Sequence, residues 1–542
     1  MPTRAAAPAL ENEPVLSYAP GTPERARIKD ALASLSADVI EIPIVVGGKP
    51  IHTGTTADVV MPHSHRHVLA RVHQAGPHEV RAAIAAAREA WRDWSTWSLE
   101  RRSAVFLKAA DLLAGAHRPR VNAATILGQS KTVHQAEIDA ACELVDFFRF
   151  NVRYAERLYA EQPLSVAGAR NTLDYRPLEG FVYAITPFNF TSIGGNLPTA
   201  PALMGNTVVW KPAATAMLSN YLIFKLLEDA GLPPGVINFV PGPAPLVSEL
   251  LLDDPHLGGV HFTGSTEVFN GIWKRVADNL KRYGSYPRLV GETGGKDFVL
   301  AHPSADVDVL AVALVRGAFE YQGQKCSAAS RAYIPRTLWP RVRERVLGIL
   351  AEVRVGDPAD FRNFMGAVID RKAFERISGY IAGARTGTGT KVLVGGGADA
   401  REGFFVEPTI IECDDPGART MREEIFGPVL SVHVYDDHRW GETLELVDRS
   451  TLYGLTGAVV AADPHAVDEA KAALRYAAGN FYVNDKPTGA VVGQQPFGGA
   501  RASGTNDKAG SALNLMRWTS ARTIKEALEP AREWRYPFME ER

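Results

Sequence analysis

The chain has 542 residues, of which 46% are hydrophobic and 22% are charged, and its formal net charge is -2. This composition is typical of a globular protein that is long enough for two or three domains. The balanced charge gives no overall basic field, so it excludes recruitment of nucleic acid or anionic lipid by long-range electrostatics.

The cysteine content and the N-terminus predict the compartment. Cys142, Cys326 and Cys413 are too few and too scattered for a disulfide framework, which favours a reducing environment. No apolar run approaches the roughly 18 residues that a membrane-spanning helix needs. The N-terminus lacks the apolar core of a secretory signal, and Glu11 and Glu13 argue against a transit peptide. We therefore expect a cytoplasmic protein that is not inserted in a membrane.

The first third of the chain is predicted to form an arm followed by helices. Residues 1 to about 35 are rich in Pro and Ala and are predicted to form an extended arm outside the core. Helical patterns with apolar stripes follow at residues 80–97, 100–116 and about 135–161.

The next region alternates strands and helices. β-branched or aromatic runs occupy residues 181–186, 207–211, 236–240, 259–262 and 288–290, and helical stretches occupy 216–230 and 267–283. This alternation favours a parallel sheet with βαβ crossovers. A second α/β region is expected from about residue 297 to 492, and the stretch after residue 510 is expected to hold an edge strand used in assembly.

Cys326 is a candidate nucleophile. It lies in Gly323-Gln324-Lys325-Cys326-Ser327, where Lys325 or a nearby helix N-terminus would lower the pKa of the thiol. A backbone N–H at this position can also face an oxyanion. The alternative is ordinary, because a lone cysteine is more often a small buried hydrophobe than a nucleophile.

Two glycine-containing turns complete a possible catalytic and binding set. Glu292 follows a predicted strand and is enclosed by glycines, so a mobile carboxylate there can activate water; the alternative is a solvated surface Glu. Thr263-Gly264-Ser265-Thr266 ends a strand and opens a helix, which suits a pyrophosphate at the helix N-terminus. Plain helix capping by Ser265 or Thr266 explains the same pattern.

Three histidines form a separate pattern. His63, His65 and His67 alternate along a predicted strand, so their rings share one face and can in principle reach one metal ion. No cysteine or carboxylate lies nearby in the sequence to complete a ligand set. We predict a solvated strand face and no metal site.

Six motifs in order resemble the aldehyde dehydrogenase superfamily across nearly the whole chain beyond the arm. They are Pro187-Phe188-Asn189, Lys211-Pro212, Phe262-Thr263-Gly264-Ser265-Thr266, Glu292-Thr293-Gly294-Gly295-Lys296, Cys326, and Glu423-Glu424-Ile425-Phe426-Gly427-Pro428. The resemblance implies an α/β fold with a Rossmann-like dinucleotide-binding domain, an α/β catalytic domain and a small β oligomerisation element. The expected boundaries are an arm at 1–35, a dinucleotide-binding domain at 36–155 and 178–293, a catalytic domain at 294–492, and a bridging element at 156–177 and 510–542.

The resemblance also implies roles for individual residues. Cys326 would be the nucleophile, Glu292 the base that hydrolyses a thioester, and Asn189 the oxyanion donor beside the Cys326 N–H. The implied cofactor contacts are Thr186, Pro187, Phe188, Lys211, Gly264, Ser265, Glu424 and Phe426. NAD is the expected cofactor, and NADP stays open because Ala214 stands where NAD-preferring relatives often have Glu.

Further motifs resemble the branch of this superfamily that oxidises L-glutamate γ-semialdehyde to L-glutamate in proline breakdown. They are Thr186-Pro187-Phe188-Asn189-Phe190-Thr191, Gln135-Ala136-Glu137-Ile138-Asp139-Ala140, Gly493-Gln494-Gln495-Pro496-Phe497-Gly498-Gly499-Ala500-Arg501 and Ser503-Gly504-Thr505-Asn506-Asp507-Lys508. The resemblance implies that Phe190 and Phe497 flank the substrate's aliphatic chain. It places the α-carboxylate at Ser327, Gly489 and Ala490, and the α-ammonium at Glu143.

The physical chemistry agrees with such a pocket, because two aromatic faces can sandwich a short apolar stem and turn N–H groups can fix a zwitterionic head. Core packing is the alternative for both phenylalanines. Ala490, where relatives often have Ser, leaves only main-chain donors there, and Phe269 stands where many relatives have Gly.

Other functions remain open at this point. One is an aldehyde dehydrogenase for another substrate, such as succinate semialdehyde or an aliphatic aldehyde; others are an acylating, CoA-dependent enzyme and a non-catalytic binding protein. The resemblance implies a homo-oligomer, at least a dimer, that acts on a small molecule, with a separate proline dehydrogenase as a possible transient partner.

Overall fold

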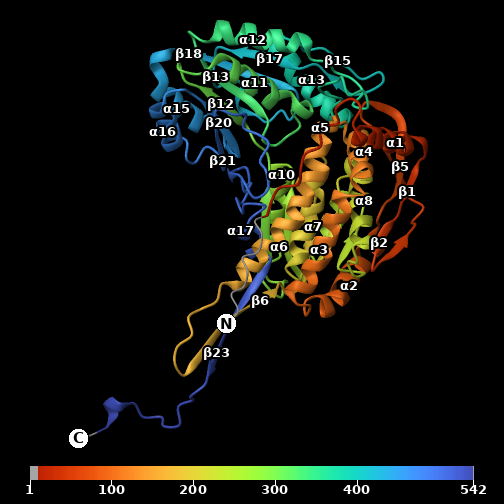
Figure 1. Ribbon diagram of the computed structural model, residues 1–542, viewed down its shortest axis with the longest axis vertical. Helices are drawn as coiled ribbons and strands as arrows, with labels where there is room; N and C mark the ends of the chain where they lie inside the picture. The colour runs from red at the N-terminus through yellow and green to blue at the C-terminus, as the bar shows by residue number, and fades with distance from the viewer. Residues whose placement is uncertain (1–9, 541–542) are drawn as a thin grey trace.

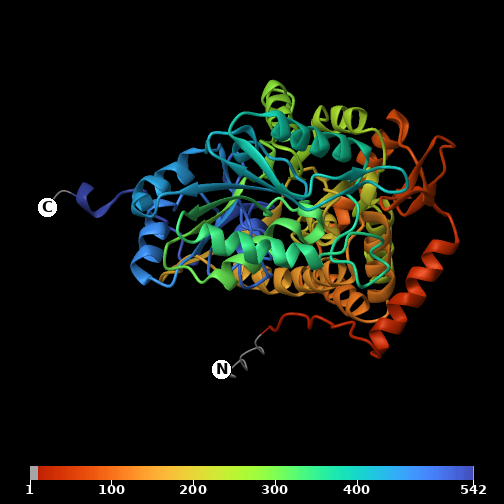
Figure 2. The ribbon, with the colours of Figure 1, turned by 90° about the horizontal axis from the view of Figure 1, so that it is seen from above.

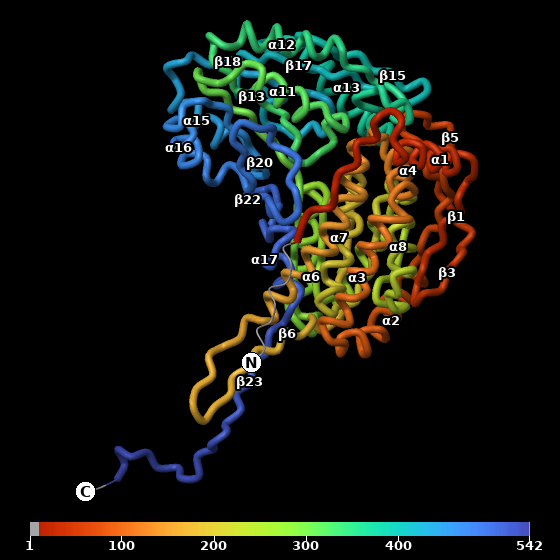
Figure 3. Tube along the Cα trace, viewed as in Figure 1, coloured from red at the N-terminus to blue at the C-terminus, as the bar shows by residue number. Residues whose placement is uncertain are grey.

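The computed structural model describes residues 10–540 (Figure 1). Over this range the chain forms two α/β lobes and a two-stranded sheet that projects from the body (Figure 3). The predicted α/β class is confirmed. None of the helices within this range is long and apolar enough to cross a membrane.

The first lobe is built on a sheet with the strand order β11-β10-β7-β8-β9-β2-β3. Its strands are β2 (Ile44–Val46), β3 (Lys49–Ile51), β7 (Phe181–Ile185), β8 (Thr207–Lys211), β9 (Ile237–Phe239), β10 (Leu257–Thr263) and β11 (Arg288–Glu292). The five from β7 to β11 are mutually parallel, whereas β2 runs antiparallel to β9. The five strands predicted from β-branched and aromatic runs are therefore confirmed.

Helices cover both faces of this sheet, as its apolar strands require. One face packs against α2 (Pro77–Trp94), α9 (Ala244–Leu252) and α10 (Thr266–Asp278). The other packs against α3 (Leu99–Ala114), α4 (Arg118–Gln129), α6 (Leu144–Ala160), α7 (Thr191–Leu203) and α8 (Met217–Asp229). The strands thus end in loops between two helical layers.

The helix predicted over residues 135–161 is interrupted. It consists of α5 (Val133–Ala136), the π-helix η1 (Glu137–Glu143) and α6. π-Helical turns inside an α-helix occur frequently at functional sites. No feature of the apolar pattern distinguishes an i→i+5 turn from an i→i+4 turn, so the sequence did not predict it.

The second lobe has a sheet with the order β14-β17-β18-β13-β12-β20-β21. Its strands are β12 (Asp297–Ala301), β13 (Ala329–Pro335), β14 (Thr390–Val394), β17 (Thr409–Cys413), β18 (Val429–Tyr435), β20 (Thr456–Val460) and β21 (Asn480–Val483), all parallel except the edge strand β14. On one face lie α11 (Val307–Phe319) and α12 (Trp339–Glu352). On the other lie α13 (Arg371–Thr386), α15 (Trp440–Arg449) and α16 (Pro464–Ala473).

The N-terminal region differs from the predicted extended arm. Residues before 10 lie outside the described range. Residues 10–22 form neither helix nor strand and turn at Pro20–Gly21, whereas α1 (Pro23–Ala37) is helical and buries Ile28, Leu32 and Leu35 in the first lobe's core. The extended prediction is wrong for α1 because the Pro- and Ala-rich composition hid these apolar residues. A small sheet of β1 (Ile40–Ile42), β5 (Ser64–His73) and β4 (Thr56–Met61) follows.

A long hairpin-like pair of strands leaves the first lobe. β6 (Ala169–Pro177) pairs antiparallel with β23 (Thr519–Ala527), which follows the short helix α17 (Ala512–Met516). The C-terminal segment then continues away from the body, at the opposite end from α1 (Figure 2). The strand expected after residue 510 is therefore present.

Candidate active site

Cys326 lies in a loop between α11 and β13, which we call the cysteine loop (residues 320–327). Tyr321 and Gln322 have φ of 53° and 55°, a left-handed conformation that is rare for residues other than glycine. Gly323 follows at φ +63°, and a Cβ there would lie 2.2 Å from the carbonyl oxygen of Gly427. The loop therefore turns sharply in a space that only glycine fits.

Buried amide side chains hold this strained loop in place. Gln322 Nε2 donates to the carbonyl oxygens of Ser130 at 2.9 Å and Ala367 at 2.7 Å, and its Oε1 accepts from Gly366 N at 3.0 Å. Gln324 Oε1 accepts from Ile369 N at 2.9 Å. A backbone conformation of this cost persists only where its surroundings fix it, which these bonds do.

The environment of Cys326 disfavours the thiolate. Burial raises its pKa above the ordinary value, and the charges of Asp297, Glu424 and Glu292 raise it further. The expectation that Lys325 lowers this pKa is wrong, because the Lys325 ammonium lies 3.1 Å from Glu320 and pairs with it. The expected helix N-terminus is also absent at Cys326, which precedes β13 in a turn.

Asn189 follows β7 and its amide lies beside the cysteine loop. Its Nδ2 donates to the carbonyl oxygen of Gln324 at 3.0 Å, two residues before Cys326. An amide nitrogen has two hydrogens, and this bond uses one of them. The second hydrogen remains for an acceptor next to the cysteine.

Glu292 is the last residue of β11, and its carboxylate contacts the backbone at Gly499. Oε2 accepts from Gly499 N at 2.9 Å. Burial raises the pKa of Glu292 well above its ordinary value, although the Gly499 N–H and the charge of Lys508 act in the opposite direction. A raised pKa makes the ionised carboxylate a stronger base toward water.

The predicted cofactor residues lie where adjacent parallel strands end. Thr186, Pro187 and Phe188 follow β7, Lys211 ends β8, and Gly264 and Ser265 follow β10. The order β10-β7-β8 places a topological switch point at β7, and dinucleotides bind at the carboxyl edge of such sheets. Two of these side chains have structural partners: Thr186 Oγ1 accepts from Trp210 Nε1 at 3.0 Å, and Ser265 Oγ caps α10 through Val268 N at 3.3 Å.

The donors left at this edge fit a dinucleotide. The Lys211 ammonium is almost fully buried, and its polar contact is the carbonyl oxygen of Pro212 at 3.3 Å. An ammonium has three hydrogens, so donors remain for ribose hydroxyls. Ala214, three residues later, is exposed and leaves open space there.

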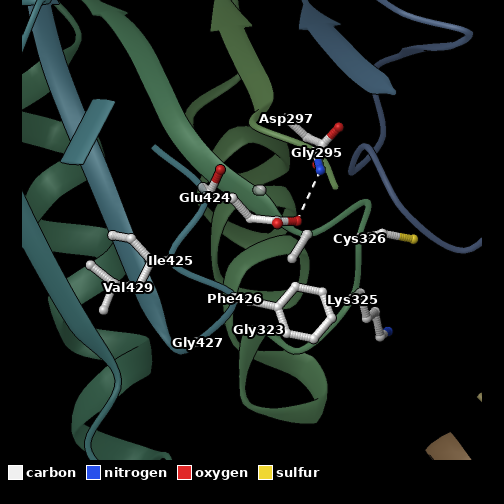
Figure 4. A pocket seen from close by; sticks show the side chains of 13 residues that line it. Gly295, Asp297, Gly323, Lys325, Cys326, Glu424, Ile425, Phe426, Gly427 and Val429 are labelled. Atoms are coloured by element: carbon white, nitrogen blue, oxygen red, sulfur yellow. Dashed lines mark hydrogen bonds between the residues drawn. The ribbon is translucent and has the colours of Figure 1, made fainter. Parts of the chain in front are cut away.

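A pocket beside Cys326 contains the other predicted cofactor residues (Figure 4). Its wall includes Gly295, Asp297, Cys326, Glu424 and Phe426. Glu424 Oε1 accepts from Gly295 N at 2.9 Å, which fixes the carboxylate in the pocket. Phe426 has φ of 54°, and its ring meets that of Phe188 edge-on, with centroids 5.8 Å apart.

Phe190, a predicted substrate contact, packs against a buried lysine. Lys131 Nζ lies 4.1 Å from the centre of the Phe190 ring and 4.5 Å from that of Tyr321. The same ammonium is 2.7 Å from Asp139 Oδ2, and both groups are fully buried. Phe190 itself is half-buried, so one face of its ring is fixed and part of it remains accessible.

A second loop, residues 488–497, lies next to the cysteine loop. Ser327 Oγ and Thr488 Oγ1 are 2.7 Å apart, which brings Ser327 beside Gly489 and Ala490. At the far end of this 488–497 loop, Phe497 exchanges backbone hydrogen bonds with Ala509 at 3.0 and 2.7 Å. These contacts bring the predicted carboxylate-binding residues together. Within the described residues, the rings of Phe497 and Phe190 do not form an aromatic pair.

Glu143 ends the π-helix, and its carboxyl lies 2.7 Å from Ser192 Oγ, which is also 2.7 Å from Asp139 Oδ1. Burial raises the pKa of Glu143 to about 8, and the charge of Asp139 raises it too. A hydroxyl has one hydrogen, so a protonated Glu143 that donates to Ser192, while Ser192 donates to Asp139, satisfies both contacts.

The predicted histidine face is not uniformly solvated. His63 is buried with Nε2 3.5 Å from Asp357, and His65 Nε2 donates to the carbonyl oxygen of Ala400 at 2.9 Å. The prediction of a solvated strand face is therefore wrong for His63, because residues from the second lobe cover it.

One other group of side chains in the described range lies close enough to share an ion, namely Glu41, His52 and His73. Gly54 N donates to His73 Nδ1 at 3.2 Å, so the ring proton belongs on Nε2, which faces Glu41 Oε1 at 2.7 Å. This arrangement is a hydrogen-bonded triad.

The sequence assigned no role to several residues around Cys326, although Asp139 lies in one of the motifs quoted above. Lys131, Asp139 and Tyr321 form a buried cluster beneath Phe190, and Asp297 lies beside the thiol with its pKa raised by burial to about 8. The ion pair joins Lys131, in the loop between α4 and α5, to Asp139 in the π-helix, and neither helical nor strand periodicity predicts such a pair. The left-handed pair before Gly323 was equally hidden, although the glycine itself was a clue.

Comparison with known proteins finds one family and several relatives similar over nearly the whole chain. The model of the aldehyde dehydrogenase family matches residues 51–524. A Dictyostelium discoideum relative named delta-1-pyrroline-5-carboxylate dehydrogenase, mitochondrial, is 52% identical and covers 99% of this chain and 97% of its own. The Homo sapiens relative of the same name is 51% identical, over 98% of this chain and 94% of its own. The crystal structure of the Mycobacterium tuberculosis delta-pyrroline-5-carboxylate dehydrogenase bound with NAD superposes with a TM-score of 0.96, at 56% identity and full coverage of both chains.

These relatives overturn the expected location. The chain was predicted to be cytoplasmic, but the relatives from Dictyostelium and human carry names that place them in mitochondria. The prediction rested on the absence of a recognisable leader, and that absence was not sufficient evidence.

Proposed function

The chain belongs to the aldehyde dehydrogenase family, and we propose on that premise that it oxidises L-glutamate γ-semialdehyde, the open form of Δ1-pyrroline-5-carboxylate, to L-glutamate with NAD. The observation that most directly supports this substrate is the hydrogen bond between Ser327 and Thr488. It joins the residue after the nucleophile to a loop rich in backbone donors, which suits an aldehyde with an α-carboxylate at its other end.

Cys326 begins the reaction in this proposal. Its sulfur attacks the aldehyde carbon as the thiolate, and the resulting oxyanion accepts hydrogen bonds from the Cys326 N–H and from the second hydrogen of the Asn189 amide. NAD, when bound, would supply the acceptor for the hydride that this carbon loses as the thioester forms. Lys211, Ser265, Glu424 and Phe426 are proposed to hold the dinucleotide at the carboxyl edge of the first sheet.

Glu292 completes the reaction. The thioester on Cys326 needs a water molecule whose proton is removed as oxygen attacks the carbonyl carbon, and Glu292 is proposed to take that proton. The C–S bond then breaks, the thiolate leaves and glutamate is released. A hydrolytic base of this kind favours a free acid as product over a CoA ester.

The substrate's head and stem have proposed partners. Phe190 and Phe497 would flank the aliphatic chain, Gly489 and Ala490 would donate to the carboxylate, and Glu143 in its ionised form would meet the ammonium. Because Lys131 fixes the Phe190 ring, that wall of the pocket is preorganised.

Domain roles and assembly are proposed alongside. The first lobe is the dinucleotide-binding domain and the second the catalytic domain, with the β6–β23 pair as an oligomerisation element. Leu164 and Val166 beside that pair are 83% and 58% exposed, which supports an interface that forms at least a dimer. A separate proline dehydrogenase is the proposed source of the substrate.

Steady-state kinetics test the proposal. With NAD, kcat/KM for L-glutamate γ-semialdehyde should exceed the values for succinate semialdehyde and pentanal by at least about 100-fold, because only the first fills both head-group sites. Equal values would refute the substrate assignment. The same assay with NADP measures cofactor preference, and Ala214→Glu should lower the NADP rate by charge repulsion while it leaves the NAD rate near that of the wild type.

A further inference from the structure

We propose that Asn12, on the N-terminal arm, is a positioning residue that fixes the 488–497 loop in its substrate-binding geometry. The inference rests on the proposed function, because it concerns the loop assigned there to the substrate carboxylate. It gives the arm a role in substrate affinity that the loop's own sequence does not reveal.

The Asn12 amide connects the loop to the first lobe. Its Nδ2 donates to the carbonyl oxygen of Val492 at 2.7 Å and to Asp146 Oδ2 at 2.8 Å. Its Oδ1 accepts from Gln494 Nε2 at 2.9 Å. Both hydrogens and the oxygen of this one amide are therefore used, two of the three bonds going to the 488–497 loop.

The arm itself is anchored firmly enough to hold the loop. Glu13 N donates to Asp146 Oδ1 at 2.8 Å, and the Glu13 carboxylate accepts from Arg118 at 2.6 Å and Arg149 at 2.7 Å. Further along, Leu16 N donates to Glu137 Oε1 at 2.8 Å. In Figure 3 the red N-terminal segment descends beside α6 toward the C-terminal segments.

The loop has internal bonds, in which Gln494 N and Gln495 N donate to the carbonyl oxygen of Val491 at 3.0 Å, and Asn12 adds an external anchor. Its ends are held by the Ser327–Thr488 and Phe497–Ala509 contacts, but Gly489, Gly493 and Gln494 between them are exposed. Val492 is buried, and its carbonyl is the one that Asn12 binds. Gly489 and Ala490 lie three and two residues before Val492, so a shift of this carbonyl is transmitted to their N–H groups through a short stretch of backbone.

Asp146 links the same anchor to the ammonium site. It lies on α6, three residues after Glu143, which is one turn of helix. The arm supplies two donors to Asp146, from Asn12 and Glu13, and so satisfies a buried carboxylate that would otherwise lack partners. Asn12 and Glu13 thus bind both the 488–497 loop, proposed to hold the substrate carboxylate, and the helix turn that follows Glu143, proposed to meet the substrate ammonium.

The test compares two five-carbon aldehydes in the full-length protein. Asn12→Ala should raise KM for L-glutamate γ-semialdehyde by about tenfold, the loss expected for one well-formed hydrogen bond to a buried group. KM for NAD and kcat/KM for pentanal, which has no α-carboxylate, should stay within about twofold of wild type. An unchanged semialdehyde KM in a protein that prefers the semialdehyde overturns the inference and leaves the proposed function intact.

Two further variants separate positioning from folding. Tyr18→Phe removes another arm contact, the hydroxyl that donates to Glu137 at 2.8 Å, without touching the loop. It should lower Tm and leave the semialdehyde KM unchanged. A rise in KM equal to that of Asn12→Ala would mean that any loosening of the arm suffices, and would refute a specific role for Asn12.

The second variant is Gln494→Ala. Gln494 is exposed, and its replacement removes the hydrogen bond to Asn12 from the loop side. It should raise KM by several-fold, and the double variant should have the same KM as Asn12→Ala. Additive effects would contradict the shared bridge. If the wild-type enzyme shows no preference for the semialdehyde over pentanal, the proposed function fails instead.

Discussion

The cysteine loop and the 488–497 loop touch through Ser327 and Thr488, yet the protein holds them in different ways. In the cysteine loop, Tyr321, Gln322 and Gln324 are fully buried, and amide side chains bind the backbone of the surrounding chain. In the 488–497 loop, Gly489, Gly493 and Gln494 are exposed, and the carbonyl of the buried Val492 is bound by Asn12 of the distant arm. The proposed nucleophile is thus fixed by the core, whereas the proposed recognition loop is fixed by a small number of side-chain contacts.

This difference has a physical explanation. A nucleophile and its oxyanion donors must hold their geometry closely, since a misplacement of about 1 Å can cost a factor of about 100 in rate. Recognition of a head group tolerates more adjustment, and loops with few buried contacts can vary without loss of the fold. The comparison predicts that changes in the first loop abolish the reaction, whereas changes in the second alter affinity.

The largest effect is expected from Cys326→Ala. Alanine offers no nucleophile, so kcat should fall by at least about 10⁴-fold. The appearance of reduced cofactor, followed by absorbance, measures it. NAD binding by calorimetry should stay near the wild-type value, and turnover within tenfold of wild type would refute covalent catalysis by this residue.

The same chemical change in each loop provides the sharpest comparison. Gly323→Ala adds a Cβ 2.2 Å from the Gly427 carbonyl oxygen, at a backbone φ of +63°. Gly489→Ala adds a Cβ whose nearest neighbour is Lys486 Nζ at 3.6 Å, at φ +97°. Only the first combines backbone strain with a clash against main chain that cannot move freely.

We expect Gly323→Ala to lower the free energy of unfolding by about 3 kcal/mol or more and to remove most activity. Gly489→Ala should cost about 1 kcal/mol, from backbone strain alone, and raise the semialdehyde KM while kcat is retained. Urea unfolding and steady-state kinetics measure both. Equal losses of stability would show that the two loops are held alike.

The sequence predicted the strands and the candidate site residues, but not the hydrogen bonds that hold the two loops in place. The parallel strands β7 to β11 followed from runs of β-branched and aromatic residues, and Cys326, Glu292 and Asn189 were identified from motifs. The supports depend on tertiary contacts between residues far apart in the chain, such as Gln322 with Ala367 or Asn12 with Val492. Neither helical nor strand periodicity encodes such contacts, so a single sequence cannot predict them.

A third prediction concerns the head-group site beside the 488–497 loop. The pKa of Glu143 is raised by burial to about 8, so the carboxyl is neutral below that pH and gains its charge as the pH rises through it. If the ionised form binds the substrate ammonium, KM for the semialdehyde should fall by about tenfold between pH 7 and pH 9. Steady-state kinetics across this range measure the change.

Two controls isolate the contribution of Glu143. Pentanal has no ammonium, so its KM should not follow the same profile. Glu143→Gln should flatten the semialdehyde profile and hold KM at the high value of acidic pH, because the amide never ionises. A profile that persists in Glu143→Gln would assign the titration to another group, such as the substrate's own amine.

The smallest effect tests whether the cysteine loop alone sets the reactivity of the thiol. Burial raises the pKa of Cys326, followed by the charges of Asp297, Glu424 and Glu292. In ligand-free protein, alkylation of Cys326 by iodoacetamide should therefore be slow at pH 7 and still be rising at pH 9. Cys142 and Cys413 are buried and should react slowly. Mass spectrometry of the peptide that contains Cys326 measures the alkylation rate of this residue alone.

Glu292→Gln removes one of the charges that oppose the thiolate. At alkaline pH, where Glu292 is ionised in the wild type, the variant should alkylate several-fold faster. At acidic pH the two rates should converge, since the pKa of Glu292 is raised by burial and the wild-type carboxyl is then neutral as well. Glu526→Gln, which changes an exposed carboxylate on β23, should have no effect. If Glu292→Gln matched the wild type at every pH, burial in the cysteine loop would account for the reactivity of Cys326 without a contribution from this carboxylate.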